Sequence, residues 1–369
     1  MGVTQYALCN HIKGTAIYRG TKYLWDVSHS RAPRLMYVSG CPGHQNLGDE
    51  ALFEACKKLF NRCSLVHYSG GRTLSIPSKL LKISGTAMLA GGTIINRMGL
   101  HAARECIDVF AKLFVFGTGV AQPAFWSGKV GRKDTLKQWK PILQRCGYVG
   151  VRGPLSAQVL REIGIDNVEV IGDPVLTFAS NNYKNWDSHE PNSIGLNVGW
   201  DRIAQWGEPE TIYAEYIQLA SIARKARWRV RWFVVWPPDL ATTTELAKIS
   251  DTEAEIYQIY SNPSEYIELV RPLSIFVGTR LHSVALATCA YVPSIMLEYR
   301  PKCRDYMMSI GQEHNTIRTD KFKAKDVWNI VNACSSKREL LSKALYQSIK
   351  PMRDKQCRKA EELMKGLSQ

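Results

Sequence analysis

An arginine and a histidine stand two residues apart at a predicted junction between a buried strand and a helix. Residues 274–277 are apolar, residues 281–290 have a helical composition, and a Gly-Thr turn separates the two segments. Ligands of open α/β sheets bind at the edge where such turns lie. Arg280 adds a planar cation to the positive end of the helix, so this junction predicts an anion site. His282 then stands in the first helical turn, beside the anion.

The turn alone leaves a second interpretation open. Arg280 can pair with a structural carboxylate, and His282 can be a core histidine whose hydrogen bonds are satisfied. The two interpretations differ in whether the cation is available to a ligand.

Other glycine-bearing turns follow predicted strands in the first half of the chain, at residues 40–50, 91–93 and 117–119. Glycine lets the backbone approach a ligand closely, although it also serves simple tight turns. Neither G-x-G-x-x-G nor G-x-x-x-x-G-K-[ST] occurs in the sequence. Dinucleotide and P-loop phosphate sites are therefore not predicted.

The composition is that of an ordinary globular protein with room for two domains, at 369 residues, 45% hydrophobic and 22% charged. Its ten cysteines form no C-x-x-C pair, which argues against a zinc site or disulfide framework and favours a reducing compartment. Cys106 and Cys289 fall in apolar patterns and are predicted core residues. Residues 1–14 lack the pattern of a secretion signal, and the longest apolar stretch, 284–297, is too short to span a bilayer. We expect a cytoplasmic protein.

The net charge of +15 is unevenly distributed. Residues 318–369 hold thirteen Lys or Arg against six Asp or Glu. A second basic cluster, residues 224–232, is interpreted as a helix end followed by a strand whose arginines alternate on its outer face, rather than as a nucleic-acid patch. The excess charge predicts an anionic partner, which can be a phosphorylated substrate, an anionic lipid carrier or a membrane surface.

Short apolar runs alternate with helical patterns along most of the chain, as in parallel α/β sheets. In the first half, strands are predicted at 35–39, 65–68, 87–90, 113–116, 148–151 and 168–171, and helices at 48–60, 100–111 and 154–163. In the second half, strands are predicted at 194–198, 231–236, 274–277 and 293–297, and helices at 212–226, 266–270 and 281–290. We therefore expect two Rossmann-like α/β domains that face a cleft, a natural place for a two-substrate reaction.

The expected domain boundaries follow from where this alternation starts, breaks and stops. They are an N-terminal extension at 1–33, an N-terminal α/β domain at 34–180, a polar linker at 181–192, a C-terminal α/β domain at 193–320 and basic C-terminal helices at 321–369. The last helices are expected to pack back onto the first domain.

Seven segments, taken in order, resemble motifs of the polysaccharide pyruvyl transferase family. They are residues 43–52 (GHQNLGDEAL), 90–93 (AGGT), 116–120 (FGTGV), 151–156 (VRGPLS), 171–174 (IGDP), 278–283 (GTRLHS) and 299–305 (YRPKCRD). Each segment alone is weak, whereas all seven in order, spanning roughly residues 34–311, are specific. The chain departs from the family pattern in having only two glycines at 91–92, Ala121 in place of a glycine and Gly153 in place of an aspartate. These departures affect the acceptor side more than the Arg-His turn.

The resemblance implies a glycosyltransferase-B-like fold and an enzyme that attaches pyruvate from phosphoenolpyruvate to two hydroxyls of a sugar as a cyclic ketal. It implies His282 as the acid/base, because carbon 3 of the donor must gain a proton and a sugar hydroxyl must lose one. Donor-binding and acceptor-binding residues follow from the same motifs. The donor residues are Arg152, Arg280, Leu281 and Lys302, and the acceptor residues are Asn46 and Asp49.

Some of these residues have simpler interpretations. Lys302 can be a solvated loop lysine, and Asp49 can merely complement the dipole of its helix. Asp173 is interpreted as a turn residue. No metal and no cofactor are predicted, since no ligand cluster is visible.

The predicted function is a pyruvyl transferase of cell-surface polysaccharide or exopolysaccharide synthesis, with a glycan acceptor whose attachment to a lipid carrier is left open. The basic tail can hold it at the inner face of the membrane, and nucleic acid is not an expected partner. One rival is a glycosyltransferase of the same architecture that uses a nucleotide sugar, with Glu298 as a candidate for the ribose hydroxyls. Another is a non-catalytic protein that binds anionic glycans or nucleic acid through its basic patches.

Overall fold

The computed structural model of the protein describes residues 33–38, 42–67, 85–110, 112–126, 134–181, 189–200 and 204–367. Several predicted features lie outside these residues. They are the N-terminal extension up to residue 32, residues 182–188 of the linker, and the predicted element ends at 39–41, 68 and 111.

The first six strands form one parallel sheet in the order β2-β1-β3-β4-β5-β6. The strands are β1 (Arg34–Val38), β2 (Ser64–His67), β3 (Thr86–Ala90), β4 (Lys112–Thr118), β5 (Tyr148–Val151) and β6 (Val168–Val170). All five residues of β3 are buried, as are the last six of β4. Such continuous burial is expected for parallel strands that are covered on both faces.

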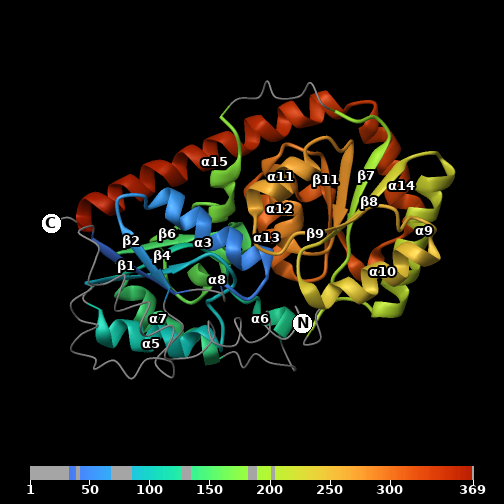
Figure 1. Cartoon of the computed structure of the whole chain (residues 1–369). Helices are drawn as coiled ribbons and strands as arrows, with labels where there is room; N and C mark the ends of the chain where they lie inside the picture. The colour runs from blue at the N-terminus through green and yellow to red at the C-terminus, as the bar shows by residue number, and fades with distance from the viewer. Residues whose placement is uncertain are drawn as a thin grey trace, which may run out of the picture.

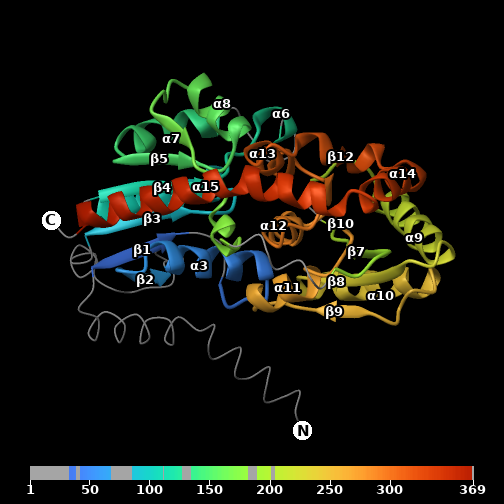
Figure 2. The same cartoon turned by 90° about the horizontal axis from the view of Figure 1, so that it is seen from above.

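Helices cover both faces of this N-terminal sheet (Figures 1 and 2). One face carries α5 (Gly99–Val109), α7 (Asp134–Gln144) and α8 (Pro154–Glu162), in a core around the fully buried Trp139. The other face carries α3 (Leu47–Leu59) and the end of α15 (Arg338–Leu367). The short α6 (Pro123–Trp126) follows β4, and the 3-10 helix η2 (Pro174–Phe178) follows β6.

The second six strands form another parallel sheet, in the order β12-β11-β10-β7-β8-β9. They are β7 (Ser193–Asn197), β8 (Arg229–Val234), β9 (Ile256–Gln258), β10 (Ile275–Gly278), β11 (Ser294–Glu298) and β12 (Thr316–Arg318). The helices on one face are α9 (Pro209–Lys225), α10 (Leu240–Ile249) and α14 (Ala324–Ser335), and those on the other are α11 (Pro263–Val270), α12 (Leu281–Cys289) and α13 (Pro301–Ser309). The 3-10 helices η3 (Pro237–Asp239), η4 (Glu313–Asn315) and η5 (Thr319–Lys321) occupy loops of this half.

A shared apolar core joins the two halves. It packs Leu47 and Leu52 of α3 and Val175 of η2 against Leu281 and Ala285 of α12, all at most 3% exposed. Parallel strands end at one edge, and α3, η2 and α12 all follow strand ends. This core therefore sets the carboxyl edges of the two sheets opposite each other.

The long helix α15 packs against both halves and stabilises this arrangement. Figures 1 and 2 show it in red along both halves, ending beside the N-terminal sheet. Ile349 joins the shared core, and Ala360 and Met364 join the core of the N-terminal sheet. Lys355 donates to the backbone oxygen of Val170. The expectation that the C-terminal helices pack back onto the first half is confirmed.

The predicted alternation of strands and helices is confirmed, with element ends shifted by up to three residues. Several elements were not predicted from the sequence. Among them are the helices α7, α10 and α13, the 3-10 helices, and the edge strands β9 and β12; α7 contains Pro141. β9 and β12 have three residues each and no fully buried position, so they lack an apolar signal. Cys106 and Cys289 are core residues as predicted, and burial raises the pKa of both thiols.

The basic cluster at 224–232 is not wholly on an outer face. Arg231 is only 7% exposed and donates to Glu190 and Glu255, which also accept from Arg229. Two glutamates thus neutralise the two strand arginines, since Glu255 directly precedes the neighbouring strand β9 and Glu190 precedes β7 on the other side of β8. The cluster is a charge network rather than an open cationic surface.

Candidate functional site

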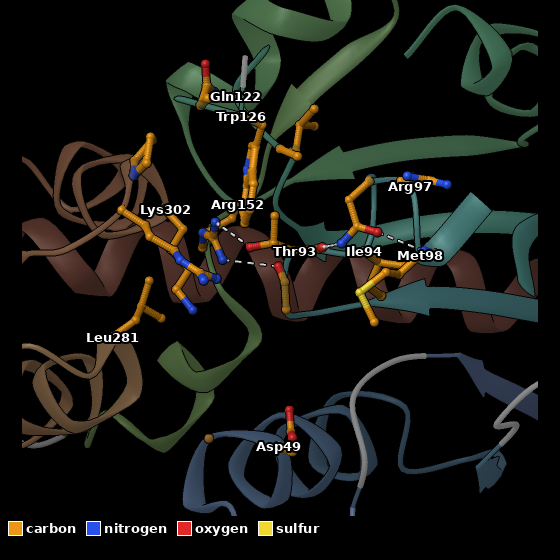
Figure 3. A pocket seen from close by; sticks show the side chains of 18 of the residues that line it. Asp49, Thr93, Ile94, Arg97, Met98, Gln122, Trp126, Arg152, Leu281 and Lys302 are labelled. Carbon is orange, nitrogen blue, oxygen red and sulfur yellow. Dashed lines mark hydrogen bonds between the residues drawn. The ribbon is translucent and has the colours of Figure 1, made fainter. Parts of the chain in front are cut away.

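A cavity of about 640 Å³ lies between the carboxyl edges of the two sheets. Its walls come from the start of α3, the turns after β3, β4 and β5, and the turns after β8, β10 and β11. Figure 3 shows Lys302 and Leu281 on one side, Arg97 and Met98 on the other, and Asp49 rising from α3. Among the described residues, the charged lining side chains other than His282 are five cations and one carboxylate: Arg97, Arg152, Arg280, Arg300, Lys302 and Asp49. Such a cavity attracts anions.

The start of α12 offers backbone donors to this cavity. Arg280 is the N-cap of the helix, and its own N–H donates to Oδ1 of Asn197 at 3.0 Å. The N–H groups of Leu281 and His282 meet no acceptor among the described residues. Because the first N–H groups of a helix have no partner within the helix, they can bind an anion. The predicted anion turn is therefore present as geometry, and Leu281 can take part through its backbone.

The guanidinium of Arg280 is held by a carboxylate. Its Nε and Nη2 donate to the two carboxylate oxygens of Asp239 at 2.8 and 2.6 Å, and it lies over the ring of Trp236. Asp239 is 5% exposed, and burial raises its pKa while Arg280 acts in the opposite direction. The structural pairing left open by the sequence therefore exists. Arg280 nevertheless lines the cavity, so its charge still reaches a ligand there.

His282 lies where the two halves meet. Its Nε2 is 3.7 Å from Oδ2 of Asp173, at the end of the N-terminal sheet. On its other side, a β-carbon added to Gly48 of α3 would lie 2.3 Å from Nδ1. The histidine side chain is 17% exposed, and Nε2 is buried without a hydrogen-bond partner. The ring is therefore held between groups of the N-terminal half, although it belongs to the C-terminal one.

Arg152 forms the floor of the cavity, as Figure 3 shows. It is 1% exposed and donates to the backbone oxygen of Gly92 at 3.1 Å and to Oγ1 of Thr93 at 3.5 Å. Its Nε lies 3.4 Å from Oδ2 of Asp305, which belongs to α13 in the other half. The cation is thus fixed in place before any ligand arrives.

Lys302 is one of two cavity cations without a carboxylate partner among the described residues. Its ammonium lies over the ring of Tyr299, 5.0 Å from the centroid, and has no carboxylate partner in the part of the chain that the structure describes. Arg97, at the opposite end in Figure 3, likewise has no carboxylate partner within the described ranges. Lys302 thus lines the cavity, where its role stays a prediction.

The predicted acceptor residues Asn46 and Asp49 both line the cavity. Asn46 is the N-cap of α3, because its Oδ1 accepts from the N–H of Gly48 at 3.0 Å. Asp49 points into the cavity from the first turn of α3 (Figure 3), and no described cation pairs with it. It is the carboxylate that a neutral ligand can reach.

The sequence analysis did not identify the carboxylates that pair with the cations of the cavity. Asp173 does start a turn as predicted, with Oδ1 accepting from Val175, but its other oxygen faces His282 and Arg152. Asp239 and Asp305 were not singled out at all. The available signal was their position after strands β8 and β11, because such residues gather at the same edge as the Arg-His turn.

Glu298, the candidate for a ribose-binding carboxylate, does not line the cavity. It is 1% exposed and accepts from Nε and Nη2 of Arg304 at 3.0 and 2.8 Å. Burial raises its pKa. Its carboxylate is therefore already occupied inside the protein.

Among the described residues, no group of three or more His, Cys, Asp or Glu side chains is arranged to hold a metal ion. The described helices also include none long and apolar enough to cross a membrane.

Comparisons with known proteins agree with this picture. The family model of polysaccharide pyruvyl transferases matches residues 46–301, more than half of the chain. No curated protein sequence matches. Among solved structures, a glycosyltransferase from Rickettsia africae is 12% identical, with a TM-score of 0.55 over 92% of this chain and 100% of that one. The complex of S. aureus MnaA with UDP is 10% identical, with a TM-score of 0.55 over 84% of this chain and 91% of that one. At such identities the likeness concerns the fold, and the expected glycosyltransferase-B-like architecture is confirmed.

The close approach of Gly48 to His282 yields a prediction. Gly48→Ala forces the imidazole or α3 to move, because the added carbon would lie 2.3 Å from Nδ1. We expect a loss of about 1–3 kcal/mol in the free energy of unfolding, measured by urea denaturation. Gly147→Ala is the matched control, since nothing lies within 4 Å of its added carbon. Equal free energies of unfolding for the two variants would contradict the close packing of His282 against Gly48.

Proposed function

This chain belongs to the polysaccharide pyruvyl transferase family, and we propose that it transfers pyruvate from phosphoenolpyruvate to two hydroxyls of a sugar as a cyclic ketal. The observation that carries the proposal is the convergence of cations and open helix N–H groups on one side of the cavity. Lys302, Arg280 and the backbone of Leu281 and His282 meet there, and the donor is a small, dense anion with a carboxylate and a phosphate.

The proposed donor residues divide into two groups. Arg152 and Arg280 are held by buried carboxylates, so they supply fixed charge and shape rather than closing upon the donor. Lys302 and the N–H groups of Leu281 and His282 have no such partner and supply the direct contacts. A preorganised cationic wall costs little to rearrange when the phosphate leaves.

The proposed chemistry needs one group that both gives and takes a proton, and His282 lies at that place. Carbon 3 of the donor takes a proton, which makes carbon 2 electrophilic. The first sugar hydroxyl adds to carbon 2 and loses its proton, the second replaces the phosphate, and phosphate leaves with the remaining proton. His282 can donate the first proton and accept the next in turn.

Two further sides of the cavity support an acceptor subsite. In Figure 3, Asp49 rises from α3 on one side, and Trp126 and Gln122 lie on the other side, beyond Arg152. A carboxylate can accept hydrogen bonds from sugar hydroxyls, and an aromatic ring with a polar neighbour suits a sugar surface. We propose a glycan acceptor bound here, in the synthesis of a cell-surface polysaccharide.

A nucleotide-sugar transferase remains the rival activity, because it shares this architecture. It is disfavoured by Glu298, whose carboxylate is buried and bonded to Arg304.

The proposed location is cytoplasmic, with peripheral contact between α15 and anionic membrane. A deletion of residues 347–369 would not test the membrane contact alone, because it would also remove the buried side chains of Ile349, Ala360 and Met364. Much of its charge is also neutralised locally, as in the pairs of Lys355 with Glu169 and Lys350 with Asp354. The contact is therefore proposed through the exposed cations that remain.

The activity itself gives the second prediction. The purified protein should release phosphate from phosphoenolpyruvate only when a suitable glycan is present, and a chelator should leave the rate unchanged because cationic side chains already face the donor. Thermal-shift titration separates the rivals, since a specific ligand raises the melting temperature. Stabilisation by nucleotide sugars and not by phosphoenolpyruvate would favour the glycosyltransferase, and loss of activity with chelator would exclude the metal-free mechanism.

Binding and chemistry should separate at the Arg-His turn. Arg280→Lys keeps the charge but cannot reproduce the fork on Asp239, so phosphoenolpyruvate should bind more weakly. His282→Ala should leave donor binding nearly intact while kcat falls by about 10²- to 10⁴-fold. Both are measured by donor titration and phosphate release. Full turnover by His282→Ala would rule out its acid/base role, and a complete loss of donor binding would make it chiefly an anion ligand.

Membrane contact is tested by reversing charges that the fold does not use. Lys343, Arg358 and Lys365 are exposed on α15, and their joint change to Glu should weaken binding to anionic vesicles by at least about tenfold at low salt. The control reverses three exposed lysines on helices of the C-terminal sheet, Lys225, Lys248 and Lys325, which gives the same net charge. Equal vesicle binding by the two variants would show that α15 has no special role.

A further inference from the structure

Two buried polar atoms face each other across the boundary between the two halves. Oδ2 of Asp173 and Nε2 of His282 are 3.7 Å apart, and neither has a hydrogen-bond partner among the described residues. Asp173 is fully buried. Leaving a buried donor or acceptor unsatisfied is costly, so such a pair signals an interaction that forms with a small movement.

We propose that Asp173 is a positioning residue, which holds the neutral imidazole of His282 with its proton on Nε2 and leaves Nδ1 to exchange protons with the substrates. The kinetic part of this inference rests on the proposed function, whereas the tautomer itself does not.

The carboxylate of Asp173 is fixed on both sides. Its Oδ1 accepts from the N–H of Val175 at 3.1 Å, which caps η2, and its backbone oxygen accepts from Nε2 of Gln356 at 2.8 Å. With one oxygen used as a cap, only Oδ2 remains to face the histidine. The long helix α15 thereby supports the residue that would orient His282.

A second carboxylate keeps Asp173 available to His282. Oδ2 of Asp173 is also 4.0 Å from Nη1 of Arg152, whose Nε lies closer, at 3.4 Å, to Oδ2 of Asp305. Because Asp305 supplies the nearer counter-charge of Arg152, Oδ2 of Asp173 can accept from His282.

The position of the ring decides which nitrogen meets the substrates. Nε2 contributes none of the 17% exposure of His282, because it is buried against Asp173. Nδ1 fills the space left by the missing side chain of Gly48, which also lines the cavity, and unlike Nε2 it is not fully buried. Nδ1 is therefore the nitrogen that can reach the cavity. A carboxylate that accepts from the far nitrogen keeps the near one available as a base.

The first test uses the intact wild-type protein. Nitrogen-15 NMR of the neutral histidines, with His282 identified among the eight by its loss in His282→Gln, reports which ring nitrogen carries the proton. We expect the Nε2–H tautomer. A neutral His282 with its proton on Nδ1 would overturn the proposal without any variant of Asp173.

The second test is Asp173→Asn, which can keep the cap on Val175 while replacing the facing oxygen with an amide donor. We expect His282 to change to the Nδ1–H tautomer and kcat to fall by about 10²- to 10⁴-fold, with KM for phosphoenolpyruvate changed by less than about threefold. Glu169→Gln is the control, because it removes a carboxylate from the adjoining strand that pairs with Lys355 instead.

The outcomes separate the two proposals. An unchanged tautomer and kcat in Asp173→Asn would overturn the positioning role. If the tautomer changes as expected but the wild-type protein has no activity with phosphoenolpyruvate, the positioning role stands and the proposed function fails.

Discussion

The apolar contact between α3 and η2 on one side and α12 on the other is the constraint on which the site depends. Each sheet by itself ends in a row of turns, and the side chains that line the cavity come from the turns of both sheets. The contact is dry, since Leu47, Val175 and Ala285 are all fully buried. Because burial of apolar area is the main favourable term in protein association, this core holds the edges together without help from the charges above it. The charged groups can then be arranged for a ligand.

Buried carboxylates make specific polar contacts between the halves. Asp305 of α13 accepts from both the N–H and Oγ of Ser156 at the start of α8, at 3.0 and 2.7 Å. The same carboxylate faces Arg152. One half thus supplies the counter-charge for a cation of the other. Across the same boundary, Oδ2 of Asp173 lies 3.7 Å from Nε2 of His282. Since breaking a buried pair leaves an uncompensated charge, these contacts define a unique relative position of the halves.

Three glycines leave room for charged or imidazole side chains to pack against the backbone. A β-carbon on Gly119 would lie 2.2 Å from Nη2 of Arg152, and one on Gly199 would lie 2.1 Å from Nε of Arg280. Gly48 stands in the same relation to His282. These three glycines are therefore explained by the protein's own charged or imidazole side chains, which approach the backbone closely. This is a different role from the cradling of phosphates by glycine loops in nucleotide-binding proteins.

The sequence by itself determined most of the longer elements and the edge of the sheets at which the cavity lies. Strands such as β3 and β10 are short, apolar and followed by glycine-bearing turns, and these local signals do not depend on distant residues. For the same reason the turn containing Arg280 and His282 could be placed at a helix start. The motif order along the chain then indicated the family.

Only the tertiary structure decided what each charged side chain does. Asp239 and Arg280 are forty-one residues apart in the chain, and Asp305 and Arg152 are more than a hundred and fifty apart, so no local pattern links them. Among the described residues, the pairing leaves Lys302 and Arg97 as cavity cations without a carboxylate partner, and it places Asp173, a turn residue, 3.7 Å from His282. The physical reason is that charge pairing depends on distance in space. That distance is set by the packing of the two halves.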